Sequence, residues 1–216
     1  AEDREPDPAL MLRGYERAAL TLNFVRSLID GGFADLHHPE NWDLDFVGES
    51  PMSADYHKLV QSVSDSLEFF ESVAGDAIHT RRVEFYTSHE GLHLPYEQAQ
   101  TRFLPHRERW YNLTTHFPWI GMRTADLDGA HVEFFRGISN PVGIKVGTGA
   151  SNEQLQGLIH LLNPSNEPGR LALITRCGAK HVDEHLPRMI QAVHDTGSQV
   201  LWICDPMHGN TETTAE

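Results

Sequence analysis

Residues 200–211 read V-L-W-I-C-D-P-M-H-G-N-T, and this stretch decides the fold class. It begins with an apolar run, residues 200–204, that suits a buried strand. It then changes abruptly to polar and turn-forming residues, among them Asp205, His208 and Gly209. A buried strand that ends in such a cluster is typical of a parallel α/β sheet, which carries its chemistry at the carboxyl edge. Asp205 and His208 can both bind a metal, although the same residues also form ordinary strand-to-helix turns.

Outward from this stretch, apolar runs alternate with segments of helical periodicity. Apolar runs predict strands at residues 33–36, 83–86, 142–146 and 171–175, and residues 111–121 contain the apolar pair Trp119-Ile120. Apolar spacing and Gly or Pro stops predict helices at residues 7–31, 54–73, 96–103, 124–138, 152–162 and 179–196, the last interrupted near Pro187. The first helix has Asp7 as its N-cap and Pro8 at its first position.

Polar residues follow nearly every strand: His37, His89 with Glu90, Lys145, Arg176, and Asp205 with His208. A doubly wound sheet would usually carry a glycine-rich phosphate turn after its first strand, and the sequence has no such motif. We therefore expect an α/β fold of the (β/α)8 TIM-barrel type. We expect the barrel to be incomplete, with about five to six βα units present and the first and last strands missing. Residues 1–216 would form one partial barrel domain with 1–31 as a leading helix, either as a partial barrel or as a piece of a longer chain.

The net charge of -14 argues against nucleic acid or an anionic membrane as a partner. We expect neither a signal peptide nor a membrane span, because the first residues are polar and no apolar run is long enough. Cys177 and Cys204 both adjoin apolar runs, which predicts buried, reduced thiols and a cytoplasmic protein.

Cations are scarce in this chain, so those beside apolar strands are informative. Lys145, Arg176 and Arg123 together predict an anionic, phosphorylated substrate, although each alone could be a salt-bridged surface cation. His89 and Glu90 fit either an acid–base pair or a structural hydrogen-bonded pair. Trp119 fits the core or a pocket wall.

Several long segments resemble the type II 3-deoxy-D-arabino-heptulosonate 7-phosphate (DAHP) synthases, and the resemblance covers essentially all of the chain. The segments are W-I-G-x-R-T (119–124), D-G-A-H-V-E-F-F-R-G-I-x-N-P-V-G-I-K-V-G (128–147), N-P-x-N-E-P-G-R-L-x-L-I-T-R-x-G (163–178), C-D-P-M-H-G-N-T (204–211), A-D-L-H (34–37) and S-H-E-G-L-x-L-x-Y-E (88–97).

The resemblance implies a (β/α)8 barrel and a transferase that condenses phosphoenolpyruvate with erythrose 4-phosphate, the first step of the shikimate pathway. It also implies a divalent metal, Mn²⁺ or Co²⁺, that polarises the aldehyde as a Lewis acid. By motif, His208 would be a metal ligand, and Lys145 and Arg176 would hold phosphoenolpyruvate. Arg123 would bind one of the anionic substrates, with Trp119 beside them at the substrate site.

Two departures from the family pattern limit this expectation. Met122 stands where the motif W-I-G-E-R-T has glutamate, so one carboxylate contact to substrate is lost. The other metal ligands of the family are a cysteine, a glutamate and an aspartate. The family carries them in segments outside residues 1–216.

Three functional hypotheses follow. The chain is the central portion of a DAHP synthase that is weakly active or inactive when isolated. Alternatively, it belongs to an amino-DAHP synthase of secondary metabolism, or it is a non-catalytic phosphoenolpyruvate-binding paralogue. Open sheet edges in an incomplete barrel also predict a homo-oligomer.

Overall fold

The computed structural model describes residues 7–33, 35, 48, 50–74 and 83–212. The chain divides into two compact units, Ala1–Phe85 and Tyr86–Glu216. The prediction of a single partial barrel domain over 1–216 stays a prediction. Each helix of the described residues is too short or too polar to cross a lipid bilayer.

The first unit contains two long helices, α1 (Pro8–Asp30) and α3 (Ser53–Ala74), close to the predicted bounds. Asp7 caps α1 as expected, because its side chain accepts a hydrogen bond from the main-chain N–H of Ala9 at 2.8 Å. The strand predicted at 33–36 is not formed at Phe33, which lies in a turn. The rest of that prediction, Leu36 with the following His37, lies outside the described residues.

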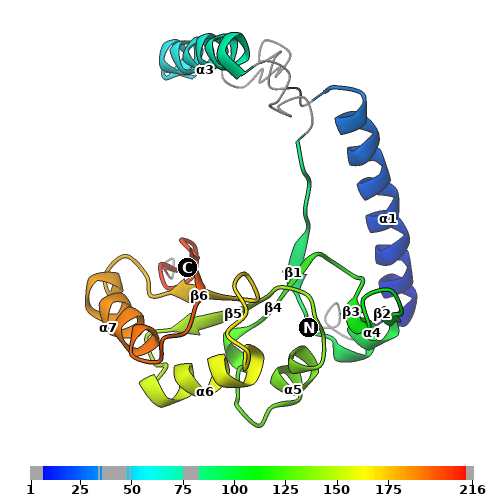
Figure 1. Cartoon of the computed structure of the whole chain (residues 1–216), viewed down its shortest axis with the longest axis vertical. Coiled ribbons are helices and arrows are strands. Elements are labelled where there is room, and N and C mark those ends of the chain that lie inside the picture. The colour runs from blue at the N-terminus through cyan, green and yellow to red at the C-terminus, as the bar shows by residue number, and fades with distance from the viewer. Residues whose placement is uncertain (1–6, 34, 36–47, 49, 75–82, 213–216) are drawn as a thin grey trace. The chain divides into compact units, whose positions relative to one another are not determined.

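The second unit is built on a five-stranded parallel sheet with the order β1-β4-β5-β6-β7 (Figure 1). The strands are β1 (Ser88–Glu90), β4 (Phe117–Ile120), β5 (Val142–Gly147), β6 (Leu171–Arg176) and β7 (Leu201–Cys204). The helices between the last four strands are α5 (Ala130–Arg136), α6 (Asn152–Leu162) and α7 (Val182–His194). From β4 to β7, each new strand is added on the same side of the strand before it. The strand order therefore never reverses, as it would in a doubly wound sheet.

Because parallel crossovers are right-handed, an unreversed order places the connecting helices on the same face of the sheet. Figure 1 shows α5, α6 and α7 together on that face. Alternate residues of β5 supply the contact: Val142, Ile144 and Val146 are buried in a core with Leu155 and Phe135 from the helices. The opposite face carries the other alternate residues, such as Gly143 and Lys145 of the same strand. This α/β arrangement is compatible with part of a barrel.

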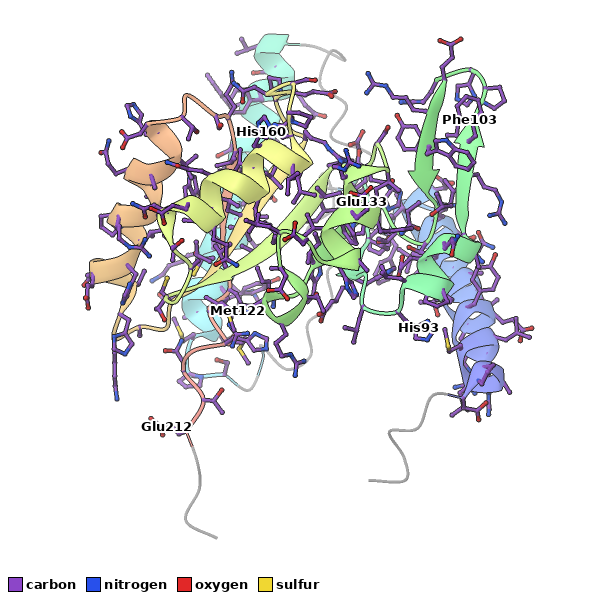
Figure 2. All side chains as sticks on the ribbon, turned by 90° about the horizontal axis from the view of Figure 1, so that it is seen from below. His93, Phe103, Met122, Glu133, His160 and Glu212 are labelled. Carbon is purple, nitrogen blue, oxygen red and sulfur yellow. The ribbon has the colours of Figure 1, made fainter. Side chains whose placement is uncertain are left out.

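The structure differs from the predicted elements in three places. The strand expected at 83–86 is wrong in position, because the ladder with β4 begins at Ser88. The helix expected at 96–103 ends early: α4 (Leu94–Ala99) is followed by the hairpin of β2 (Thr101–Leu104) and β3 (Arg109–Asn112). Figure 2 shows Phe103 on this hairpin.

The helix expected at 124–138 is also shorter than predicted. A short 3-10 helix, η4 (Met122–Thr124), comes first. A turn then closes with a hydrogen bond from the Gly129 N–H to the Asp126 carbonyl, and α5 begins only at Ala130. Because of this turn, the helix begins later in the sequence than predicted, and Met122 and Arg123 lie in the short segment after β4.

Candidate active site

The carboxyl ends of the parallel strands gather the predicted site residues at one edge of the sheet. Lys145 lies near the end of β5, and Arg176 is the last residue of β6. Asp205 follows β7 directly, and Arg123 lies in η4 after β4. Figure 2 shows Met122 and Glu212 towards this same edge, while His160 of α6 lies towards the other.

Lys145, Asp205 and His208 form one connected group. The Lys145 Nζ donates to Asp205 Oδ2 at 2.6 Å, and His208 Nδ1 lies 2.7 Å from the same oxygen. The Lys145 and Asp205 side chains are 13% and 9% exposed, so this ion pair is largely buried. The other carboxylate oxygen, Asp205 Oδ1, accepts from the main-chain N–H groups of Met207 and His208 at 3.0 and 3.1 Å. Asp205 therefore fixes both the lysine and the loop that carries the histidine.

The electrostatics of Asp205 follow from these contacts. Burial raises the pKa of the Asp205 carboxyl, but hydrogen bonds from Lys145, His208 and the Met207 main chain outweigh burial. The pKa of Asp205 consequently lies well below its ordinary value. With Nδ1 of His208 donating to this carboxylate, its Nε2 is the ring atom available to a metal or substrate, an arrangement common for metal-binding histidines.

Trp119 lies against Lys145 on the sheet face opposite the helices. The Lys145 Nζ is 4.4 Å from the centroid of the Trp119 ring, within the range of a cation–π interaction. Gly143 makes this possible, because it pairs with Trp119 in the sheet and a Cβ at Gly143 would lie 3.0 Å from the Trp119 Cβ. Trp119 therefore forms a wall beside the lysine.

Arg176 and Arg123 differ from Lys145 in their partners. Arg176 is partly buried and lies beside Gly147 in the sheet register, whereas Arg123 is exposed. Within the described part of the chain, neither arginine has an ion pair or a side-chain hydrogen bond. The structure thus brings Lys145, Trp119 and His208 into one group. It places Arg176 on the adjoining strand end and Arg123 in the loop after β4.

A cavity of about 200 Å³ opens beside Lys145. Its lining includes Met122, Gly147 and Gln154. Met122 packs over Gly147, since a Cβ at Gly147 would lie 2.7 Å from the Met122 Sδ. The thioether that departs from the family pattern therefore lines the same cavity as the lysine.

A second polar group lies at the start of the sheet and was not predicted. His89 pairs with Glu97 instead of the adjacent Glu90, with 2.7 Å between His89 Nε2 and Glu97 Oε1. Asn112 Nδ2 and Thr114 Oγ1 donate to the other oxygen, Glu97 Oε2, at 2.5 and 2.8 Å. Burial raises the pKa of Glu97, but these hydrogen bonds outweigh burial and lower it. The structure therefore pairs His89 with Glu97 and not with the predicted partner Glu90.

The loops after β6 and β7 contact each other through two glycines. Gly178 and Gly209 have φ of +74° and +86°, and a Cβ at Gly178 would lie 2.5 Å from the Gly209 carbonyl oxygen. The Ala179 N–H donates to Asn210 Oδ1 at 2.7 Å, which ties the loops further. This contact holds the loop of His208 against the loop that follows Arg176.

The cysteine prediction is correct only for Cys177. Cys177 is buried and burial raises the pKa of its thiol, whereas Cys204 is exposed. Cys204 differs because it ends β7, which forms an edge of the five-stranded sheet. Both cysteines are free thiols.

Comparison with known proteins identifies the family of this chain. A model of the class-II DAHP synthetase family matches residues 1–216. The chain belongs to the class-II DAHP synthetase family. Three relatives are named phospho-2-dehydro-3-deoxyheptonate aldolase. The relative from Streptomyces coelicolor is 42% identical over 212 residues, covering 98% of this chain and 47% of the relative.

The relative from Neurospora crassa is 39% identical over 231 residues, covering 99% of this chain and 48% of the relative. The relative from Mycolicibacterium smegmatis is 40% identical over 220 residues, covering 100% of this chain and 47% of the relative. The chain thus spans about half the length of these class-II DAHP synthetase relatives. All the segments quoted above fall within the matched residues.

Proposed function

We propose that this chain forms the phosphoenolpyruvate-binding part of a DAHP synthase, and that the whole protein condenses phosphoenolpyruvate with erythrose 4-phosphate. The enol carbon of phosphoenolpyruvate bonds to the aldehyde carbon, water adds to the former enol carbon, and inorganic phosphate leaves. The (β/α)8 barrel, the homo-oligomer and a cytoplasmic location belong to the same proposal. The observation that carries it is the group of Lys145, Trp119, Asp205 and His208 at the carboxyl edge of a parallel sheet in a class-II family member.

In this proposal, the lysine and the two arginines contribute to anion binding in different ways. Lys145 is one of the residues that line the cavity, and its ion pair with Asp205 holds it in place before substrate arrives. Arg176 and Arg123 have no partner among the described side chains, and a guanidinium binds phosphate or carboxylate in bidentate geometry. These two arginines therefore supply uncompensated charge for the substrate anions.

The metal that the family implies fits this edge only in part. The Nε2 of His208 is available as a ligand. Within the described residues, no group of three or more ligand side chains surrounds His208. One imidazole does not make a strong divalent site, so we assign His208 as one ligand of Mn²⁺ or Co²⁺ and derive no step through the metal.

Phosphoenolpyruvate binding and turnover test the proposal separately. Titration calorimetry of the 216-residue chain with phosphoenolpyruvate should show binding in wild type, and Arg176→Gln should weaken it more than about tenfold. Arg102→Gln, an exposed arginine on the β2–β3 hairpin, is the matched control and should bind like wild type.

In the whole protein, phosphate release from the two substrates should fall by about 10²–10³-fold in Arg176→Gln. The isolated chain should release little or no phosphate. Equal phosphoenolpyruvate affinity in Arg176→Gln and wild type would refute the assignment of Arg176, and steady turnover by the isolated chain would refute the predicted inactivity.

A second candidate rests on Met122, whose thioether lines the cavity where the family pattern has a carboxylate. In this alternative the whole protein is an amino-DAHP synthase, with an imino-sugar phosphate in place of erythrose 4-phosphate. Phosphate release with each acceptor, compared between wild type and Met122→Glu, distinguishes the candidates. A preference for the imino acceptor that reverses in Met122→Glu would favour the second.

A further inference from the structure

We propose that His181, Glu184 and His185, at the start of α7, bind a divalent transition metal such as Zn²⁺ at a site separate from His208. The three side chains each offer one ligand atom, and these atoms all lie within 4.8 Å of one another. The site goes beyond the proposed function, since it uses none of the residues assigned to phosphoenolpyruvate or to the family's metal.

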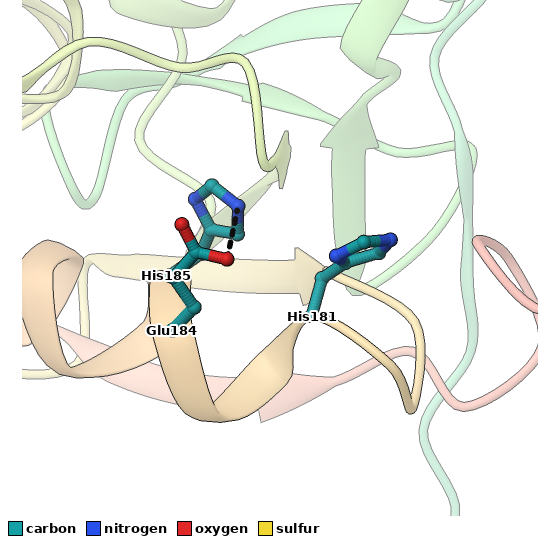
Figure 3. A group of neighbouring side chains, drawn as sticks. All are labelled: His181, Glu184 and His185. Atoms are coloured by element: carbon teal, nitrogen blue, oxygen red, sulfur yellow. Dashed lines mark ion pairs between the residues drawn. The ribbon is translucent and has the colours of Figure 1, made fainter.

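The backbone of α7 brings these ligands together. His181 is the N-cap residue, and Glu184 and His185 follow three and four positions later. Residues at these spacings lie on one face of a helix, one turn apart. Figure 3 shows Glu184 and His185 side by side in the first turn, with His181 just before it.

The geometry requires only side-chain adjustment. Two ligands of tetrahedral zinc, each about 2.1 Å from the ion, lie roughly 3.4 Å apart. The present separations are at most 4.8 Å, and His181 and Glu184 are exposed and can change rotamer. The backbone therefore needs no movement for all three ligands to reach one ion.

The existing interactions of the group do not compete strongly with a metal. The His185 Nε2 and Glu184 Oε2 are 3.9 Å apart, which is too long for a hydrogen bond. The rings of His181 and His185 contact edge to face, with centroids 6.2 Å apart. Glu184 is 77% exposed, so a bound ion would keep open positions for water.

The donor set selects the class of ion. Two imidazoles with one carboxylate suit Zn²⁺, Co²⁺, Ni²⁺ or Cu²⁺, whereas Mg²⁺ and Ca²⁺ prefer all-oxygen sites. The carboxylate of Asp183 lies next in sequence to this group and favours a cation, while the adjacent Lys180 and the positive end of the α7 dipole oppose it. The opposing charges keep the affinity below that of a structural zinc site.

Titration of the 216-residue chain with Zn²⁺ at neutral pH tests the site, with heat and thermal shift as readouts. Wild type should bind Zn²⁺ at this site and gain thermal stability. His185→Ala and Glu184→Gln should each weaken binding more than about tenfold, since even outer groups of metal sites have effects of that size. Mg²⁺ should produce neither signal.

Two matched variants locate the binding. His160→Ala removes an exposed histidine of α6, and His194→Ala removes an exposed histidine at the other end of α7. Both should retain wild-type Zn²⁺ affinity. Unchanged affinity in His185→Ala, loss of affinity in His194→Ala, or no Zn²⁺ binding by wild type would each overturn the proposal. Glu184→Gln, on an exposed side chain, distinguishes ligand loss from misfolding.

Discussion

At the scale of single residues, Asp205 connects the two chemical roles of the site. One of its oxygens accepts a hydrogen bond from Lys145, which we propose binds phosphoenolpyruvate, and the same oxygen orients His208, the proposed metal ligand. Loss of one partner from a largely buried pair leaves the other charge without compensation. The Lys145–Asp205 pair should therefore matter for stability as well as for binding.

Lys145→Met should lower the free energy of unfolding by about 3 kcal/mol, because it leaves the Asp205 carboxylate buried without its cation. Arg136→Met is the matched control, since it breaks the exposed ion pair with Glu133 in the same unit. The control should cost far less, because solvent screens exposed pairs. Urea denaturation of both variants measures the difference, and equal losses would contradict this account of the buried pair.

The lowered pKa values of Asp205 and Glu97 predict acid sensitivity. A carboxyl whose pKa is lower in the folded state than in the unfolded state stabilises the fold while it is ionised. That stability is fully present above the unfolded pKa, near 4, and is lost as pH falls towards the folded value.

The free energy of unfolding should therefore decrease as pH falls below about 5, and the decrease should be smaller in Asp205→Asn than in wild type. Urea denaturation at a series of pH values measures both slopes. Parallel slopes in the two proteins would show that Asp205 contributes nothing to the acid sensitivity.

The sequence identified some members of these groups and not others. Lys145 and His208 could be picked out because Lys145 lies near the end of a recognisable strand and His208 follows one. Glu97 was missed as the partner of His89, since its partners Asn112 and Thr114 lie 15 and 17 positions away and only the fold brings them together. The carboxyl of Glu97 is buried, and no local sequence pattern indicates this burial.

At the scale of elements, the sequence predicted those whose cause is local. The bounds of α6 agree with prediction at both ends, and β5, β6 and β7 agree within a residue or so. Strand β1 was misplaced because its residues are polar and its cause is the pairing with β4. Residues 101–103 of β2 fall in the predicted helix for the same reason, because this strand is defined by its pairing with β3.

The contact between the two strand-end loops gives a prediction at this scale. Gly209→Ala should be much more destabilising than Gly197→Ala, although both glycines have positive φ. A Cβ at Gly197 would have no atom within 4 Å, so Gly197→Ala should lose stability only through backbone strain of about 1–2 kcal/mol.

A Cβ at Gly209 would lie 2.8 Å from the Gly178 nitrogen, which adds a steric cost of about 1–3 kcal/mol. Urea denaturation of the two variants measures the difference. Equal destabilisation would show that the loops move apart freely, and would argue against a fixed position for His208.

At the scale of the whole molecule, the five-stranded sheet ends in edge strands. β7 lies at one end of the strand order, and Leu201 on it is 60% exposed. An exposed apolar edge strand pairs readily with another chain. The parallel order and the helices on one face agree with the predicted α/β class, whereas barrel closure depends on strands that a local sequence pattern does not specify.

Leu201→Lys should therefore reduce self-association of the chain, because a lysine on an edge strand opposes pairing. Light scattering after size-exclusion chromatography over a range of concentrations measures it. Ile190→Lys, at a 44% exposed position on α7, is the matched control and should associate like wild type. Equal association of wild type and Leu201→Lys would place the interface elsewhere.

The unreversed strand order has a consequence for biosynthesis. From β4 onwards, each new strand pairs with the one translated just before it, and each connecting helix packs on the same side. Each of these strand pairings joins residues 24 to 29 positions apart, so it needs only the one βα unit that lies between the two strands. The nascent chain can extend the sheet one βα unit at a time as it leaves the ribosome, and no completed strand must be displaced to admit a later one.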